Sequence, residues 1–125
     1  MISKEAVKLI HSKLIENYGG SQGVRDLALL ESAIGRPFAT FDGVELYGGP
    51  VEKAAALLES ILINHPFIDG NKRTGYTLAR LVLLSEGYDL KASQDEKYDF
   101  VISITTGQLT IEEITTWLKT HSYKL

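Results

Sequence analysis

The sequence contains no cysteine, only three prolines and a single tryptophan in 125 residues. The lack of cysteine excludes a disulfide framework, a thiol nucleophile, an iron–sulfur cluster and a cysteine-ligated zinc site. No apolar run approaches the roughly 20 residues that cross a bilayer, and the first residues lack the long apolar segment of a signal peptide. We therefore expect a cytoplasmic protein that is stabilised by its core and does not contact membranes.

Positive charge is scarce as well. Lys and Arg number 13 against 16 Asp and Glu, so the formal net charge is −3. Direct binding of nucleic acid normally requires a strongly basic surface and is not expected, although a local basic pocket is compatible with this balance. The hydrophobic share of 44% and the charged share of 23% are ordinary for a globular protein, and the length predicts a single domain over residues 1–125.

Apolar residues recur at helical spacing along most of the chain. Capping boxes at Ser93 and Thr110 begin the last two predicted helices. The third predicted helix has the widest apolar face, which is typical of a central buried helix. We therefore predict an all-α fold, a compact domain of six helices with little or no sheet. The six predicted helices cover about residues 4–18, 26–34, 51–64, 71–86, 94–106 and 110–121.

Residues 35–50 are the least regular part of the chain. The aromatic residues Phe38, Phe41 and Tyr47 lie there among several glycines. A loop or a small β-hairpin fits this composition best. Two interpretations stay open: the aromatic side chains form a lid or docking surface, or they pin the loop to the core.

The segment from His65 to Tyr76 places polar residues between the two most apolar predicted helices. Lys72 and Arg73 occupy the first turn of a helix, where the helix dipole already contributes partial positive charge and each added cation costs roughly 0.3–1 kcal/mol. A bound anion would remove this conflict. Gly70, just before the helix, would let backbone N–H groups approach a phosphate closely. The segment therefore predicts a phosphate site.

His65 and Asp69 add reactive groups to this phosphate site. Histidine is suited to proton transfer near neutral pH, and a carboxylate beside a polyphosphate usually holds Mg²⁺. Taken singly, each feature has a structural explanation: His65 could cap the preceding helix, and Asp69 with Gly70 could be an ordinary turn. Their combination at fixed spacing favours a nucleotide-dependent transferase.

Residues 65–73, His-Pro-Phe-Ile-Asp-Gly-Asn-Lys-Arg, resemble the signature H-x-F-x-(D/N)-(G/A)-N-(G/K)-R of the Fic/Doc family. Residues 18–20 and 30–37 and the helical layout are similar to the Doc (death on curing) branch, so the likeness covers most of the chain. It implies the compact six-helix Fic/Doc fold, with a small loop or β-hairpin flap.

The resemblance also implies a reaction. Fic enzymes typically transfer AMP from ATP to a protein hydroxyl, and their signature has Gly at the position of Lys72 and a second Arg at the position of Tyr76. The Doc branch carries the same Lys. It implies transfer of the γ-phosphate of ATP, with Mg²⁺, to a hydroxyl of elongation factor Tu, which stops translation.

The resemblance assigns three catalytic residues. His65 takes the proton of the attacking hydroxyl, Asp69 holds Mg²⁺, and Arg73 binds phosphate oxygens as a fork. The expected nucleotide-binding residues are Gly70, Asn71, Lys72 and Arg73.

Two alternatives stay open for the function, and one partner is implied. The first alternative is AMP transfer by a Fic-like mechanism. The second is an inactive anion- or peptide-binding module of the same fold, although a binding module would not need His65. The Doc branch also implies a Phd-like antitoxin, whose C-terminal segment folds onto the toxin.

Two further features need an interpretation. Ser12, Glu16 and Asn17 match the inhibitory pattern (S/T)-x-x-x-E-(G/N) of Fic proteins, but they lie in the first core helix and we favour a chance match.

Arg80 follows Arg73 by seven residues and shares its helix face. Arg80 either extends the basic surface or pairs with a nearby acid, and we favour the ion pair.

Overall fold

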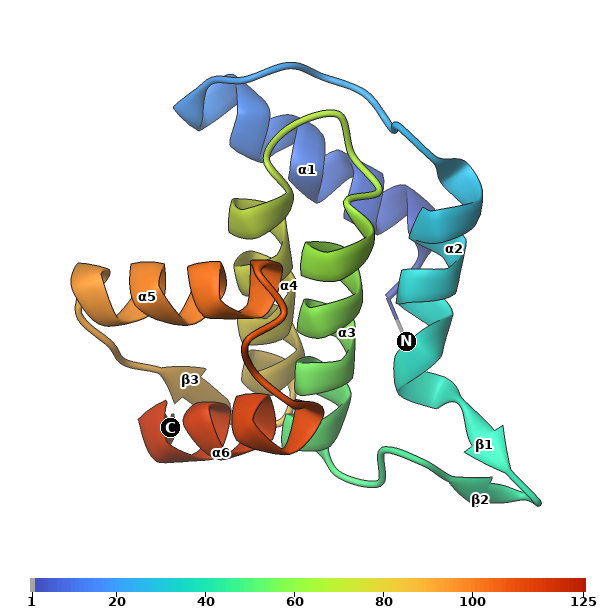
Figure 1. Cartoon of the computed structure of the whole chain (residues 1–125), viewed down its shortest axis with the longest axis vertical. Coiled ribbons are helices and arrows are strands. Elements are labelled where there is room, and N and C mark those ends of the chain that lie inside the picture. Colours follow the sequence, from blue (N-terminus) through green and yellow to red (C-terminus); the bar gives the residue numbers. More distant parts are fainter. Residues whose placement is uncertain (1) are drawn as a thin grey trace.

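The computed structural model describes residues 2–125, and over this range it confirms the predicted six-helix fold (Figure 1). None of the helices in the described range is long and apolar enough to span a membrane. The helices are α1 (Lys4–Tyr18), α2 (Leu27–Gly35), α3 (Pro50–Asn64), α4 (Asn71–Ser85), α5 (Gln94–Thr105) and α6 (Ile111–His121), and a 3₁₀ turn, η1 (Arg36–Phe38), follows α2.

Side-chain caps set most of the helix starts. The Ser3 hydroxyl accepts a hydrogen bond from the Ala6 N–H at the start of α1. Both predicted capping boxes form, at Ser93 for α5 and at Thr110 for α6. Each such cap contributes about 1 kcal/mol, which explains why the predicted and observed starts agree closely.

Two small antiparallel sheets accompany the helices. β1 (Thr40–Phe41) and β2 (Val44–Glu45) form a hairpin inside the irregular segment, as the composition predicted. β3 (Tyr88–Leu90) follows α4 and pairs with β4 (Ser122–Lys124), which follows α6. This second pairing was not predicted, because it joins segments that flank α5 and α6 and leaves no local sequence signal.

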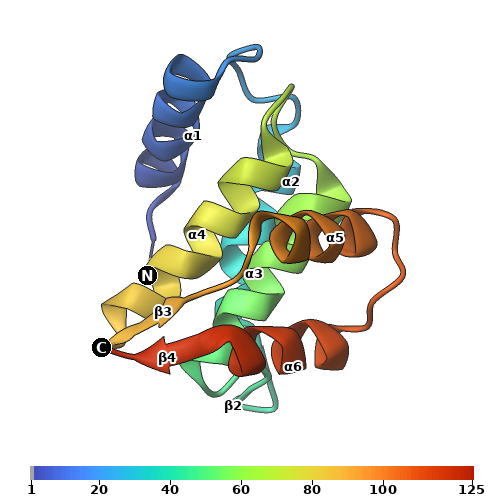
Figure 2. The same cartoon turned by 90° about the vertical axis from the view of Figure 1, so that its left-hand side faces the viewer.

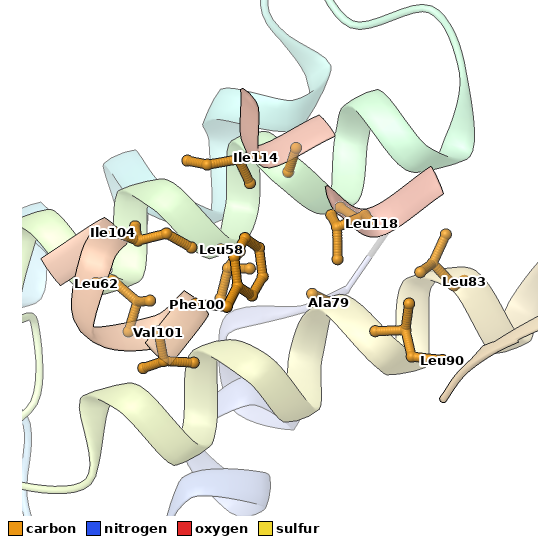
Figure 3. Packing of buried hydrophobic residues seen from close by; sticks show 12 residues of the cluster. Leu58, Leu62, Ala79, Leu83, Leu90, Phe100, Val101, Ile104, Ile114 and Leu118 are labelled. Carbon is orange, nitrogen blue, oxygen red and sulfur yellow. The ribbon is translucent and has the colours of Figure 1, made fainter. Parts of the chain in front are cut away.

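The central helix α3 takes part in both clusters of buried apolar side chains, as its wide apolar face predicted. One cluster packs α3 and α4 against α5, α6 and β3, with Leu58 and Phe100 near its centre (Figure 3). The other packs α3 and α4 against α1 and α2, and it includes Phe67 from the loop between α3 and α4. Burying one such side chain contributes about 1.5–3 kcal/mol. Both clusters therefore hold the α3–α4 hairpin in place.

Gly75 lets α3 and α4 approach closely. A Cβ atom at this position would lie 3.3 Å from side-chain atoms of Leu58, Ile61 and Leu62 on α3. The two helices are therefore closely packed near the loop that joins them, which suits a site that needs accurately placed groups.

The β1–β2 hairpin lies at the opposite end of α3 from the α3–α4 loop (Figures 1 and 2). Tyr47 is tied to the core through Arg36, because its hydroxyl accepts a hydrogen bond from the Arg36 side chain, which also donates to the Ser60 hydroxyl on α3. Phe38 and Phe41 are 37% and 76% exposed, and Phe38 lies over Lys53 in a cation–π contact. Of the three aromatic residues, Tyr47 therefore fits the pinned interpretation, and the hairpin is no lid for the α3–α4 loop in this arrangement.

Candidate functional site

The loop between α3 and α4 has a left-handed residue at each end. His65 ends α3 with φ 49°, and Gly70 precedes α4 with φ 75°. The expected capping role of His65 is carried by its backbone, whose N–H donates to the Ile61 carbonyl at 3.1 Å. A left-handed backbone at a non-glycine residue costs on the order of 1–2 kcal/mol, and such strain is typical of functional sites.

Asn71 holds the loop in shape. Its Oδ1 accepts a hydrogen bond from the Phe67 N–H, and its Nδ2 donates to the Phe67 carbonyl, both at 3.0 Å. From the sequence we interpreted this amide as a ligand for substrate or phosphate. The structure shows that both ends of the amide bind the loop backbone, while the residue also lines the cleft described below.

The connection between α1 and α2 runs beside the α3–α4 loop and binds its backbone (Figures 1 and 2). The Ile68 N–H donates to the Gly23 carbonyl at 3.1 Å, and the Arg25 N–H donates to the Pro66 carbonyl at 2.7 Å. These bonds satisfy backbone groups that the loop itself leaves without partners.

Arg25 reinforces this connection through its side chain. The guanidinium donates to the carbonyls of Asn64 and His65, at 2.6 and 2.7 Å. These carbonyls belong to the end of α3, where the helix itself provides no donor. The contact of Arg25 could not be predicted from the sequence, because nothing near Arg25 in the chain indicates a partner 40 residues away.

His11 on α1 is a second residue outside the motif whose side chain binds the loop. It is 2% exposed, and its Nε2 lies 2.7 Å from the Asp69 carbonyl oxygen. A signal was present in the sequence: His11 lies four residues after Val7 and four before Ile15, on the buried face of α1. A polar residue in the middle of an apolar stripe indicates a buried polar contact.

An open cleft of about 630 Å³ begins at the N-terminus of α4 and extends toward α5. Four cations line it but only one acid, although the whole chain has a net charge of −3. Such a local reversal of charge favours an anionic ligand. The charged and aromatic lining residues are Lys72, Arg73, Arg80, Lys97, Asp69, Tyr18, Tyr76 and Tyr98.

Lys72 and Arg73 lie in the first turn of α4 and have no ion pair within residues 2–125. The Arg73 guanidinium carbon lies 4.3 Å from the centre of the Tyr18 ring, a cation–π contact that leaves its charge uncompensated. Glu16, the residue of the inhibitory pattern, pairs instead with Lys13, at 3.6 Å. The conflict between two cations and the helix dipole is therefore present in the structure.

Arg80 forms the ion pair that we favoured. Its guanidinium donates two hydrogen bonds to the Asp89 carboxylate, at 2.6 and 3.0 Å. These bonds hold the pKa of the Asp89 carboxyl below its usual range. Most of the Arg80 charge is thus compensated, and the anion-binding character of the cleft depends on Lys72, Arg73 and Lys97.

Asp69 presents a carboxylate at the mouth of the cleft. Its Oδ1 accepts from the Gly70 N–H at 2.8 Å, and its Oδ2 accepts from the Ser21 N–H at 3.1 Å. Each oxygen keeps a further lone pair for a cation. No group of three or more metal-ligating side chains occurs among residues 2–125. A single carboxylate with free lone pairs is a donor that fits Mg²⁺, which is commonly bound by one or two carboxylates together with water and substrate phosphates.

His65 is separated from the other candidates in one respect. Gly70, Asn71, Lys72 and Arg73 line the cleft together with Asp69, whereas His65 lies at the far end of the loop and does not line it. Its side chain is partly exposed and has no hydrogen-bond partner in the described part of the chain. The imidazole is therefore available to a substrate that approaches over the loop.

A second cavity, of about 760 Å³, lies between the start of α1, η1, the start of α3 and the end of α4. Its lining is mostly apolar. Its one cation, Lys53, is bound by the Tyr47 carbonyl and Glu45. This cavity therefore lacks the groups that would bind a phosphate.

A helical fold with two cations at the start of α4, directly after the loop that begins at His65, matches one known family of proteins. Residues 1–83 match the profile of the Fic/DOC family, and the chain belongs to this family.

Curated relatives narrow the comparison to Doc proteins. "Toxin Doc" of Mycolicibacterium smegmatis is 39% identical over 99 residues, which cover 78% of this chain and 76% of that protein. "Protein kinase doc" of Escherichia phage P1 is 30% identical over 118 residues, covering 94% and 92%. A Fido domain-containing protein of Dictyostelium discoideum is 47% identical over 51 residues, covering 38% and 36%.

Proposed function

We propose that this protein is a toxin that transfers the γ-phosphate of ATP to a hydroxyl of a protein target. The observation that carries the proposal is the start of α4, where Lys72 and Arg73 border the cleft and have no ion pair with any residue that the structure describes. Backbone N–H groups, helix dipole and both cations favour a polyphosphate at this place. The names of two relatives, a toxin and a protein kinase, support the same activity.

His65, Asp69 and Arg73 have separate roles in this reaction. His65 accepts the proton of the target hydroxyl as its oxygen bonds to the γ-phosphorus, and the bond from that phosphorus to ADP breaks. Arg73 binds phosphate oxygens as a bidentate fork. Asp69 would hold Mg²⁺, which neutralises phosphate charge when bound. Phosphoryl transfer depends mainly on positioning and charge stabilisation, so this small scaffold is sufficient.

The cleft has room for the rest of the nucleotide. Its volume of about 630 Å³ lies within the range of about 300–1,000 Å³ typical of small-molecule sites. Tyr98 is 67% exposed on the α5 side of the cleft and offers an aromatic face for a base. Lys97 adds a cation on the same side.

Incubation with elongation factor Tu, the target that the family resemblance suggests, tests the proposal. ATP labelled at the α- or the γ-phosphate is supplied in separate reactions with Mg²⁺, and the intact mass of the target is measured. The proposal predicts label from the γ-position only, with a mass increase of about 80 Da for one phosphoryl group. Label from the α-position with an increase of about 329 Da would make the protein an AMP transferase instead. Absence of transfer from both positions would contradict the choice of target or of reaction.

We also propose that a Phd-like antitoxin restrains this toxin in the cytoplasm, where elongation factor Tu acts. The support is the similarity to "Toxin Doc" of Mycolicibacterium smegmatis, because a toxin of this kind is generally paired with an antitoxin. Expression of the chain with and without a small protein encoded next to it measures the effect. Growth arrest that the neighbour relieves, together with copurification of the two chains, is the expected result.

A further inference from the structure

His11 belongs to α1, outside the sequence motif, and packs against the motif loop with its whole ring. The imidazole is stacked on the Phe67 ring, with 3.9 Å between the ring centroids and 5° between the planes. His11 and Phe67 are 2% and 1% exposed. The stack therefore fixes the plane in which the two ring nitrogens lie.

The hydrogen bond of His11 fixes its protonated nitrogen. Nε2 lies 2.7 Å from the Asp69 carbonyl oxygen, which can only accept a hydrogen bond, so Nε2 carries a proton. The bond crosses 58 positions of the sequence and connects α1 to the peptide unit between Asp69 and Gly70.

Asp69 is held by three contacts. His11 binds its carbonyl, and the N–H groups of Ser21 and Gly70 bind the two carboxylate oxygens. The same peptide unit leads into Gly70 and the first turn of α4. Rotation of this unit would turn the Gly70 N–H away from the carboxylate. The bond from His11 opposes that rotation.

We propose that His11 is a positioning residue for phosphoryl transfer, because its Nε2–H fixes the peptide unit that orients the Asp69 carboxylate. This inference rests on the proposed function. Misplacement of reacting groups by about 1 Å can cost on the order of 100-fold in rate. Lys72 and Arg73 do not depend on His11 for their position in the helix, so loss of the bond should lower kcat more than it weakens binding of ATP.

A set of three variants separates the hydrogen bond from general stability. His11→Phe keeps a ring on Phe67 but removes the donor. His11→Gln removes the ring but places an amide N–H the same number of bonds from the backbone. Val7→Ala, at a buried position one turn earlier on α1, removes packing but touches no donor. For each variant we would measure thermal stability, kcat and KM for ATP, and amide hydrogen exchange at Gly70 and Ser21.

For His11→Phe we expect kcat to fall about 10–100-fold, with KM for ATP within about threefold of the wild type. Exchange at Gly70 and Ser21 should accelerate by about tenfold or more. His11→Gln should recover kcat to within about fivefold of the wild type. Val7→Ala should lower stability. Its kcat, calculated per folded molecule, should stay equal to that of the wild type.

Unchanged exchange at Gly70 and Ser21 in His11→Phe would overturn the inference, whatever the activity. An equal loss of kcat in His11→Gln and Val7→Ala, in step with stability, would also overturn it, because the role would then be packing alone. If His11→Phe does not fold, amide exchange at Gly70 and Ser21 in His11→Gln decides: a retained donor predicts exchange close to that of the wild type, whereas a role in packing alone predicts the acceleration that loss of the ring would cause. A wild-type protein without transfer activity would refute the proposed function, and the exchange data would still decide whether His11 holds Asp69.

Discussion

His65 combines two properties that can be separated by mutation. Its backbone ends α3 in a left-handed conformation, and the carbonyl is held by Arg25. Its imidazole, in contrast, has no partner within the described residues and remains available for proton transfer. A substitution that tolerates a positive φ should therefore remove the chemistry and keep the turn.

We expect His65→Asn to lower the rate of phosphoryl transfer by roughly 10²–10⁴-fold, the contribution of a general base. Asparagine tolerates the left-handed region better than most residues, so the midpoint of thermal unfolding should stay close to that of the wild type. Labelled ATP and calorimetry measure the two quantities, and relief of growth arrest in cells is a third test. A stably folded His65→Asn protein with full activity would exclude His65 from the mechanism.

The other residues of the site differ in how far the sequence indicated their roles. Asp69 and Arg73 lie where the motif spacing predicted them, beside the start of α4. Asn71 was predicted to bind the nucleotide; its amide binds the Phe67 backbone and the residue also lines the cleft, so binding of the nucleotide stays a prediction. A short polar side chain can bind its own loop and still offer its remaining hydrogen-bonding capacity to a ligand, and only the loop conformation shows the first of these contacts.

Among the helices, α4 contains the two residues on which the proposed choice of reaction rests. Lys72 stands where AMP-transferring relatives are expected to have Gly, and Tyr76, one turn later, stands in place of their second Arg. Tyr76 is half-buried, and burial raises the pKa of its phenol although the charge of Arg80 acts in the opposite direction. The phenol is thus neutral at physiological pH and does not replace the missing cation.

Lys72→Gly tests the link between this helix start and the reaction. Without the Lys side chain, the backbone N–H groups could receive the α- and β-phosphates directly, so we expect loss of phosphoryl transfer and a weak gain of AMP transfer. The double variant Lys72→Gly/Tyr76→Arg should transfer AMP faster than the single variant Lys72→Gly. Its gain stays partial, because Lys97 lies 5.7 Å from the Tyr76 ring and would repel the new cation.

The intact mass of the modified target distinguishes the two products, because phosphate adds about 80 Da and AMP about 329 Da. Tyr76→Arg alone serves as the control for added charge. If Lys72→Gly still transfers phosphate at the wild-type rate, Lys72 does not determine which group is transferred.

In the whole molecule, the two apolar clusters meet at the α3–α4 hairpin, and one ion pair connects this hairpin to the C-terminal sheet. Asp89 on β3 is bound by Arg80 of α4, and β3 pairs with β4 near the C-terminus. The Asp89 carboxylate also accepts a hydrogen bond from the Leu90 N–H. Removal of this carboxylate should therefore affect stability far more than catalysis.

Asp89→Asn should lower the free energy of unfolding by about 1–2 kcal/mol at pH 7, a modest value because the Arg80 side chain is half-exposed. The folded pKa of Asp89 is lowered, first by the hydrogen bond from Arg80. The contribution is therefore complete above the ordinary Asp pKa of about 3.9 and is lost as the pH falls through the lower folded value.

Urea unfolding at pH 7 and at about pH 2 measures this dependence, and the two proteins should become equal in stability at the lower pH. Asp99→Asn, at an exposed position of α5, is a matched control. A difference that persists undiminished at low pH would show that the ion pair does not cause it.

Local sequence was sufficient to predict the six helices and the loop that contains the candidate site residues. Caps, apolar spacing and motif spacing act between residues a few positions apart, so Ser93, Thr110 and residues 65–73 could be interpreted without a partner. Tertiary structure alone decided the pairing of β3 with β4 and the contacts of His11 and Arg25 with the loop. These interactions join residues that are 40 or 58 positions apart or flank two helices. A hydrogen-bond donor such as the Arg25 side chain can bind many different acceptors equally well. Its partner is decided only when the two apolar clusters pack and bring the α1–α2 connection beside the α3–α4 loop.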